Sequence, residues 1–224
     1  MTGLKLLFSR YFSHKRILLG VAAFFLLMMA AVMLFHEDSG GDPADFIMCK
    51  VSALAPMMFA VFLPFTFMVQ DTVGNRFMRS VPCAESLYMR GIPLFSLLVP
   101  LGWGVLTNVV YAAFILFTGR DVSNISDLLV MTGMFGGIFA LVGCIVMCLK
   151  FGAIFFVIFY SPFILVMTTV SSSANEYGYG LPLWMSALIC CGSYIAAFVI
   201  GNIISVLAYR KGNFREGTQT RTSI

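Results

Sequence analysis

Long apolar runs, separated by short polar segments, set the pattern of this 224-residue chain. A membrane-spanning helix needs about 20 mostly apolar residues, and six runs approach or exceed that length. We therefore expect an all-α integral membrane protein whose transmembrane domain covers residues 17–208. The expected spans are Ile17–Phe35, Val51–Val69, Ile92–Thr118, Leu128–Leu149, Gly152–Val170 and Leu183–Ala208.

A different pattern precedes the first span. Over residues 1–16, apolar side chains recur at helical spacing and polar ones fall between them. This pattern predicts an amphipathic helix that lies in the membrane interface with its apolar face toward the lipid. A frayed tail is the alternative. The apolar positions are Leu4, Leu7, Phe8, Tyr11 and Phe12, and the polar ones are Lys5, Ser9, Arg10 and Ser13.

Two further segments connect or follow the spans. Lys150 is the one charged residue between Leu128 and Val170, and with Gly152 it predicts a tight turn in a helical hairpin. One very long helix is the alternative, but it would overshoot the bilayer. Residues 209–224 are polar, and we expect them to form a flexible cytoplasmic tail.

Composition supports the membrane assignment. Sixty per cent of the residues are apolar, 11% are charged and the mean hydropathy is +0.94. Soluble domains are about 45–50% apolar and about 25% charged. A soluble fold of this size could not bury so much apolar surface. The net charge of +4 is modest, and the placement of the charges indicates orientation in a membrane rather than binding to nucleic acid.

The basic residues gather on one side of the predicted spans. If the N-terminus is inside, twelve of the 14 Lys and Arg residues lie on inner segments, which is the bias that sets membrane orientation. We therefore expect a multi-pass protein of the plasma membrane with both termini in the cytoplasm. The inner residues are Lys5, Arg10, Lys15, Arg16, Arg76, Arg79, Arg90, Lys150, Arg210, Lys211, Arg215 and Arg221, and the outer ones are Lys50 and Arg120.

Residues that carry catalysis or bind cofactors are scarce. His14 and His36 lie at opposite membrane faces, and no GxxxxGK[ST] phosphate-binding loop is present. We expect no enzyme activity, cofactor or metal in this chain. Cys144 and Cys148 lie four residues apart, and we interpret them as packing residues rather than metal ligands. No ionisable residue lies deep in a predicted span, which argues against a proton-driven transporter.

The inner loop between the second and third spans, about residues 70–90, is the most informative segment. It is too long for a tight turn, and Pro82 should break or begin a helix there. A short amphipathic segment of this kind is what docking to a soluble partner requires. A solvated connector is the alternative. The loop mixes the charged residues Asp71, Arg76, Arg79 and Glu85 with the apolar residues Phe77, Met78 and Val81.

This loop resembles that of ABC-2 type transporter permeases. In that family an acidic residue and a glycine follow the second span, and a Leu-Pro-like turn precedes a basic residue at the third. Cys83 and Ala84 depart from the family pattern, in which a small hydroxyl residue and an arginine are common. The order of elements is similar over the whole chain. The matching positions are Asp71, Gly74, Ser80-Val81-Pro82 and Arg90.

The resemblance implies a function and partners. In that family two permeases pair, and each binds a separate ATPase through this loop. The chain would then be the permease subunit of a compact bacterial exporter for an amphipathic or hydrophobic cargo, peptide or drug-like. Two copies of a cytoplasmic ATPase would hold ATP and Mg. The implied coupling residues are Asp71, Gly74, Arg76, Phe77, Arg79, Pro82, Glu85 and Arg90.

Aromatic and small residues add two expectations. The second and fifth spans flank the subunit boundary in that family, so the resemblance implies that their phenylalanines wall the cargo path. Lipid contact or core packing is the alternative. Small residues four apart predict close helix packing, which we expect within the monomer. The phenylalanines are Phe59, Phe62, Phe65, Phe155, Phe159 and Phe163, and the small residues are Gly133, Gly137, Ser193, Ala197, Gly201 and Ser205.

Two other classes of function stay open besides an exporter permease. One is a membrane scaffold or accessory subunit that transports nothing. The other is a secondary transporter or channel. A co-purifying ATPase would favour the exporter over both.

Overall fold

The computed structural model describes residues 3–13, 15–16, 18–24, 27, 65, 68, 72–73, 77–118, 123–148 and 181–211, almost all of them helical. Among these residues, three helices are long and apolar enough to cross a membrane: α6 (Ile92–Thr118), α7 (Ser123–Cys148) and α9 (Leu183–Lys211). They confirm that the third, fourth and sixth apolar runs form helices. The runs expected to form the first, second and fifth spans lie largely outside the described residues.

The helix bounds differ from the expected ones where polar residues join a span. α7 begins at Ser123 rather than Leu128 because Ser126 finds partners inside the bundle. Its hydroxyl donates to the carbonyl of Leu181 at 2.7 Å and lies 2.6 Å from the hydroxyl of Ser186. α9 runs to Lys211 rather than Ala208, and cations in the last helical turn interact favourably with its carbonyl dipole.

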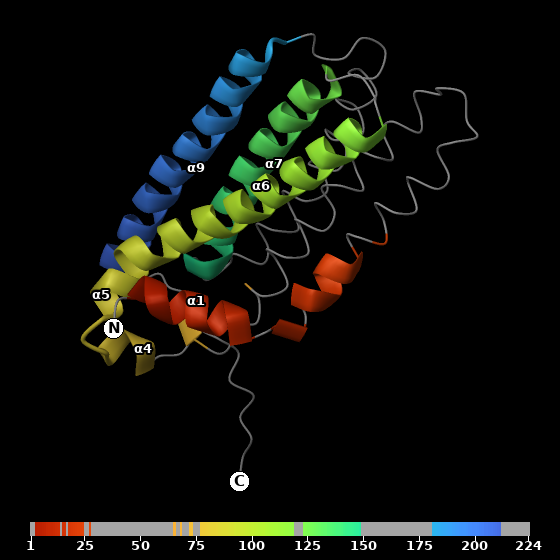
Figure 1. Cartoon of the computed structure of the whole chain (residues 1–224). Coiled ribbons are helices and arrows are strands. Elements are labelled where there is room, and N and C mark those ends of the chain that lie inside the picture. The colour runs from red at the N-terminus through yellow and green to blue at the C-terminus, as the bar shows by residue number, and fades with distance from the viewer. Residues whose placement is uncertain are drawn as a thin grey trace.

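α7 and α9 run parallel and pack tightly through small residues (Figure 1). A Cβ added at Gly133 would lie 2.5 Å from the Cα of Cys190, and one added at Gly137 would lie 2.9 Å from the carbonyl oxygen of Ser193. The Ser193 hydroxyl donates to the carbonyl of Gly133 at 2.6 Å. The prediction of close packing within the monomer is therefore confirmed for this pair.

α6 runs antiparallel to this pair and meets it through polar side chains. The side-chain amide of Asn108 donates to the Thr132 hydroxyl on α7 at 2.7 Å. The Tyr194 hydroxyl of α9 donates to the carbonyl of Pro100, inside α6, at 3.4 Å. Such interhelical hydrogen bonds hold helices together where both surfaces are apolar.

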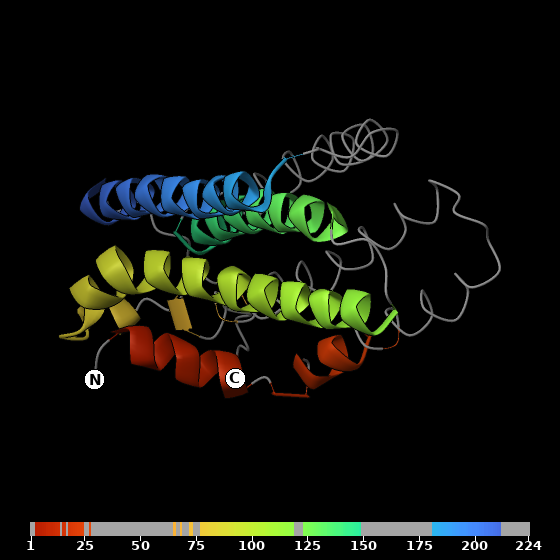
Figure 2. The ribbon, with the colours of Figure 1, turned by 45° about the horizontal axis from the view of Figure 1, so that its top comes forward.

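α1 (Gly3–Ser13) lies across the end of the bundle at which α6 begins and α7 and α9 end (Figures 1 and 2). Leu7 and Tyr11 are buried against the protein rather than turned toward lipid. The indole N–H of Trp103 donates to the Tyr11 hydroxyl at 2.9 Å. Burial raises the pKa of Tyr11 to about 12, and this hydrogen bond opposes the rise. The location of α1 at a membrane interface stays a prediction.

The core gathers at this same end of the bundle. Phe65 is fully buried, with its ring centroid 5.2 Å from that of Phe95, and its ring fills the space where a Cβ on Gly143 would lie. These are contacts of a core side chain. The other five phenylalanines proposed for a cargo path lie outside the described residues. Cys144 and Cys148 pack on α9, where their thiols donate to the Gly201 carbonyl and the Ser205 hydroxyl.

Candidate partner-docking site

Residues 77–91, here called the docking segment, form a compact helical turn that leads into α6. It consists of α4 (Phe77–Ser80), α5 (Ala84–Ser86) and η2 (Leu87–Gly91), the last a stretch of π-helix. The chain bends between α4 and α5 at Pro82, as expected from its lack of an N–H donor. The N–H of Ala84 donates to the Val81 carbonyl at 2.9 Å and closes the turn.

The docking segment has one buried and one exposed side. Ala84, Leu87 and Tyr88 are buried and face the bundle. The side turned away carries an apolar side chain beside charged and polar ones, with Val81 exposed to 38%. The solvated-connector alternative does not require a buried side, whereas a docking element needs a fixed base. The exposed residues are Ser80, Val81, Pro82, Glu85, Ser86 and Arg90.

Glycine backbones join the docking segment to α1. A Cβ added at Gly3 would lie 2.4 Å from the Cα of Leu87, a distance that real Cβ atoms do not show. A Cβ added at Gly91 would lie 3.4 Å from the backbone of Gly3. Only glycine at position 3 therefore permits α1 to begin directly on η2.

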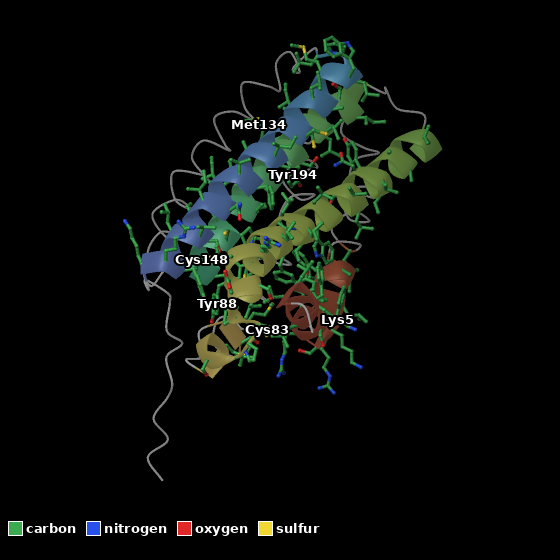
Figure 3. All side chains as sticks on the ribbon, turned by 90° about the vertical axis from the view of Figure 1, so that its left-hand side faces the viewer. Lys5, Cys83, Tyr88, Met134, Cys148 and Tyr194 are labelled. Atoms are coloured by element: carbon green, nitrogen blue, oxygen red, sulfur yellow. The ribbon has the colours of Figure 1, made fainter. Side chains whose placement is uncertain are left out.

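Tyr88 joins the docking segment to α9. Its ring stacks on that of Tyr209, with centroids 6.1 Å apart, and its hydroxyl donates to the Val73 carbonyl at 2.6 Å. The Ser205 hydroxyl donates to the backbone carbonyl of Tyr88. Figure 3 shows Tyr88 close to both the docking segment and the end of α9, with Cys83 nearby.

The π-helix explains why Ser205 reaches that carbonyl. In η2 the N–H of Ile92 donates to the Leu87 carbonyl, five residues back. The same pattern would require an N–H from residue 93 for the Tyr88 carbonyl, and residue 93 is proline, which has none. The Ser205 side chain provides a donor from α9 instead.

The structure places the predicted coupling residues unequally. Pro82, Glu85 and Arg90 are exposed on the docking segment. Phe77 and Arg79 belong to α4, but their side chains are outside the described part of the structure. The remaining three, Asp71, Gly74 and Arg76, are outside the described residues.

Sequence reasoning missed the residues that anchor the docking segment. Gly3, Tyr88 and Tyr209 carry no spacing pattern that separates them from other glycines and tyrosines. Ser205 was recognised as a small packing residue, and its hydrogen bond to the Tyr88 carbonyl could not be foreseen. A glycine at the start of an amphipathic helix was the one available signal for close backbone contact.

The described part of the site combines exposed apolar and charged side chains with a buried side that packs on the bundle. Among the described residues, no group of three or more His, Cys, Asp or Glu side chains is placed to hold a metal ion. The exposed tip instead combines Val81 and Pro82 with the acidic Glu85. Comparisons with protein-family models, curated proteins and solved structures find no match to this chain.

Proposed function

We propose that this protein is the membrane subunit of an ATP-binding-cassette exporter. A separate ATPase docks on residues 77–91, and the hydrolysis of ATP in that subunit drives transport of an amphipathic or hydrophobic cargo. The permease acts as a homodimer in the plasma membrane, with both termini and the docking segment in the cytoplasm. Phe65 packs in the core, so the proposed cargo path keeps the other phenylalanines of the second and fifth spans, which are Phe59, Phe62, Phe155, Phe159 and Phe163.

One observation carries the proposal: the exposed tip of the docking segment is fixed to the bundle on its other side. A partner that displaces Val81 or Glu85 also displaces the buried side of the docking segment. Tyr88 attaches that side to α9, and Leu87 attaches it to α1. Force applied at the tip therefore reaches membrane helices directly. A connector that is only solvated does not require these contacts with α1 and α9.

The direction of the helices supports six spans. Cys148 at the end of α7 contacts Ser205 near the end of α9, and Ser126 contacts Ser186 near the starts of both helices. A chain that passes through two membrane helices in the same direction needs a return crossing between them. This requirement supports the proposed fifth span at Gly152–Val170. α1 and η2 lie at the same end of the bundle, which agrees with an even number of crossings between them, as the first two proposed spans would give.

The proposed orientation predicts which positions an impermeant thiol reagent reaches. Single cysteines at Ser86 and Lys211, in a cysteine-free background, are expected to stay unlabelled in intact cells. A cysteine at Pro182, at the opposite end of α9, is expected to be labelled. Permeabilised cells serve as the control, since all three are exposed. Labelling of Ser86→Cys in intact cells, with Pro182→Cys protected, would reverse the topology.

The exporter proposal predicts that an ABC ATPase co-purifies with the tagged wild-type protein. The reconstituted complex is expected to hydrolyse ATP, whereas the permease alone does not. The matched preparation contains the ATPase expressed without the permease. If an ATPase encoded beside this gene never associates with the protein under any of these conditions, the exporter proposal fails and a scaffold becomes the better hypothesis.

A further inference from the structure

An open groove of about 580 Å³ lies between the N-terminal helical residues and α6. Pockets of about 300–1,000 Å³ hold small ligands. Its lining is apolar except at a few points, and several apolar side chains at its rim are exposed. The α1 side contributes Phe8, Tyr11, Phe12, Lys15, Leu18, Leu19 and Ala22, and the α6 side contributes Leu98, Val99, Gly102, Trp103 and Leu106.

A glycine and several aromatic rings are among the lining residues of the groove. A Cβ added at Gly102 would meet nothing within 4 Å, so the space beside it is empty. Trp103 and Tyr11 are held in place by the hydrogen bond of 2.9 Å from the indole N–H to the Tyr11 hydroxyl. The groove is thus kept open by fixed side chains.

Of the described residues that line the groove, Lys15 is the charged one. Lys15 is exposed, and no carboxylate of the described residues forms an ion pair with it. Lys5, Arg10 and Arg16 are exposed on the same N-terminal helical segment. The groove therefore pairs an apolar lining with one cationic side chain, that of Lys15, and this is the complement of a molecule with an apolar chain and an anionic head.

We propose that this groove binds an anionic phospholipid, with an acyl chain along Gly102 and Trp103 and the phosphate head near Lys15. The open side exposes Phe12, Leu19 and Leu106, so in a membrane the groove opens onto acyl chains. A basic side chain near an anionic lipid surface contributes about 1 kcal/mol, which corresponds to about a fivefold preference. This site is separate from the docking segment and does not depend on the ATPase.

The chain contains two tryptophans, which allows a direct test. Trp184 is 65% exposed at the start of α9, and Trp184→Phe leaves Trp103 in the groove as the sole indole. This variant is reconstituted in vesicles of equal parts phosphatidylglycerol and phosphatidylcholine. Two samples are compared: in one the phosphatidylglycerol carries brominated acyl chains, and in the other the phosphatidylcholine does. Brominated chains quench tryptophan fluorescence on contact. We expect the relative affinity for the site at Trp103, obtained from the quenching in the two samples, to be about fivefold higher for phosphatidylglycerol than for phosphatidylcholine.

The complementary variant, Trp103→Phe, keeps Trp184 as the reporter of bulk lipid. The two brominated lipids are expected to quench Trp184 equally. Equal quenching of Trp103 by both lipids in the first variant would overturn the proposal, because it would show ordinary lipid contact only.

Two further variants in the Trp184→Phe background locate the site. Gly102→Phe places a ring at a position whose Cβ meets nothing within 4 Å and is expected to abolish the preference, whereas Gly192→Phe, on an exposed face of α9 where a Cβ also meets nothing within 4 Å, keeps it. Lys15→Gln is expected to reduce the preference to near one, while Lys5→Gln, exposed on α1 but outside the groove lining, keeps it. A preference that survives Gly102→Phe would place the lipid elsewhere and overturn the proposal.

Discussion

The double variant Val81→Asp/Glu85→Lys is expected to lower the affinity for the ATPase at least about 100-fold. A charge-assisted contact contributes about 1–3 kcal/mol, and each 1.4 kcal/mol is about tenfold in affinity. Val81 and Glu85 lie at the exposed tip, so the variant loses an apolar contact and reverses a charge. A solvated tip would contribute only about 0–1 kcal/mol per exposed pair.

The substitutions should not disturb insertion, because together they raise the positive charge on the proposed cytoplasmic side. Affinity is measured by binding the purified ATPase to the permease in nanodiscs. Arg210→Glu is the matched control, since it reverses an exposed charge at the same end of the bundle but on α9. Unchanged ATPase binding by the double variant, with normal folding, would remove the docking segment from the interface.

Gly133→Leu is expected to lower the apparent melting temperature by roughly 5 °C or more. The added side chain would enter space occupied by the backbone of Cys190, with the Cβ alone 2.5 Å from its Cα. No rotamer relieves a contact with backbone, so α7 and α9 have to separate. Overpacking of this kind costs about 1–3 kcal/mol and occasionally more. The separation would also break the hydrogen bond from Ser193 to the Gly133 carbonyl.

Gly192→Leu is the control for that experiment, because a Cβ added there meets nothing within 4 Å. It makes the same chemical change in a membrane helix and is expected to shift stability by less than about 0.5 kcal/mol. Thermal unfolding of both variants in detergent, followed by helical circular dichroism, gives the comparison. If both variants have the melting temperature of the wild-type protein, α7 and α9 do not pack as closely as described.

The apolar runs predicted α6, α7 and α9 because membrane helices are selected by length and hydropathy alone. The expected start of α6 at Ile92 and of α9 at Leu183 agrees with the structure. The predicted start of α7 at Leu128 was too late. Hydropathy places a serine outside a span, even where its hydrogen-bond partners come from a segment distant in sequence. Ser126 is satisfied by Leu181 and Ser186, which no local pattern reveals.

The candidate site was predicted in outline only. Pro82 marked the turn correctly, because the missing N–H acts locally. The anchoring by Tyr88 and Ser205 joins residues 117 positions apart and depends on a π-helical stretch. The apolar positions of α1 were expected to face lipid, yet Leu7 and Tyr11 face protein. An amphipathic pattern shows that a helix has an apolar face but does not name what covers it.

The parallel pairing of α7 and α9 has a consequence for how the chain is made. Their contacts join residues 57–60 positions apart, such as Cys144 with Gly201 and Gly133 with Ser193. At a synthesis rate of about 5–20 residues per second, α7 leaves the ribosome roughly 3–12 s before its partner. The glycine face of α7 has no α9 to cover it during that interval. We expect chains truncated before Leu183 to be bound by membrane chaperones or degraded, because α9 is translated after α7 and covers its glycine face.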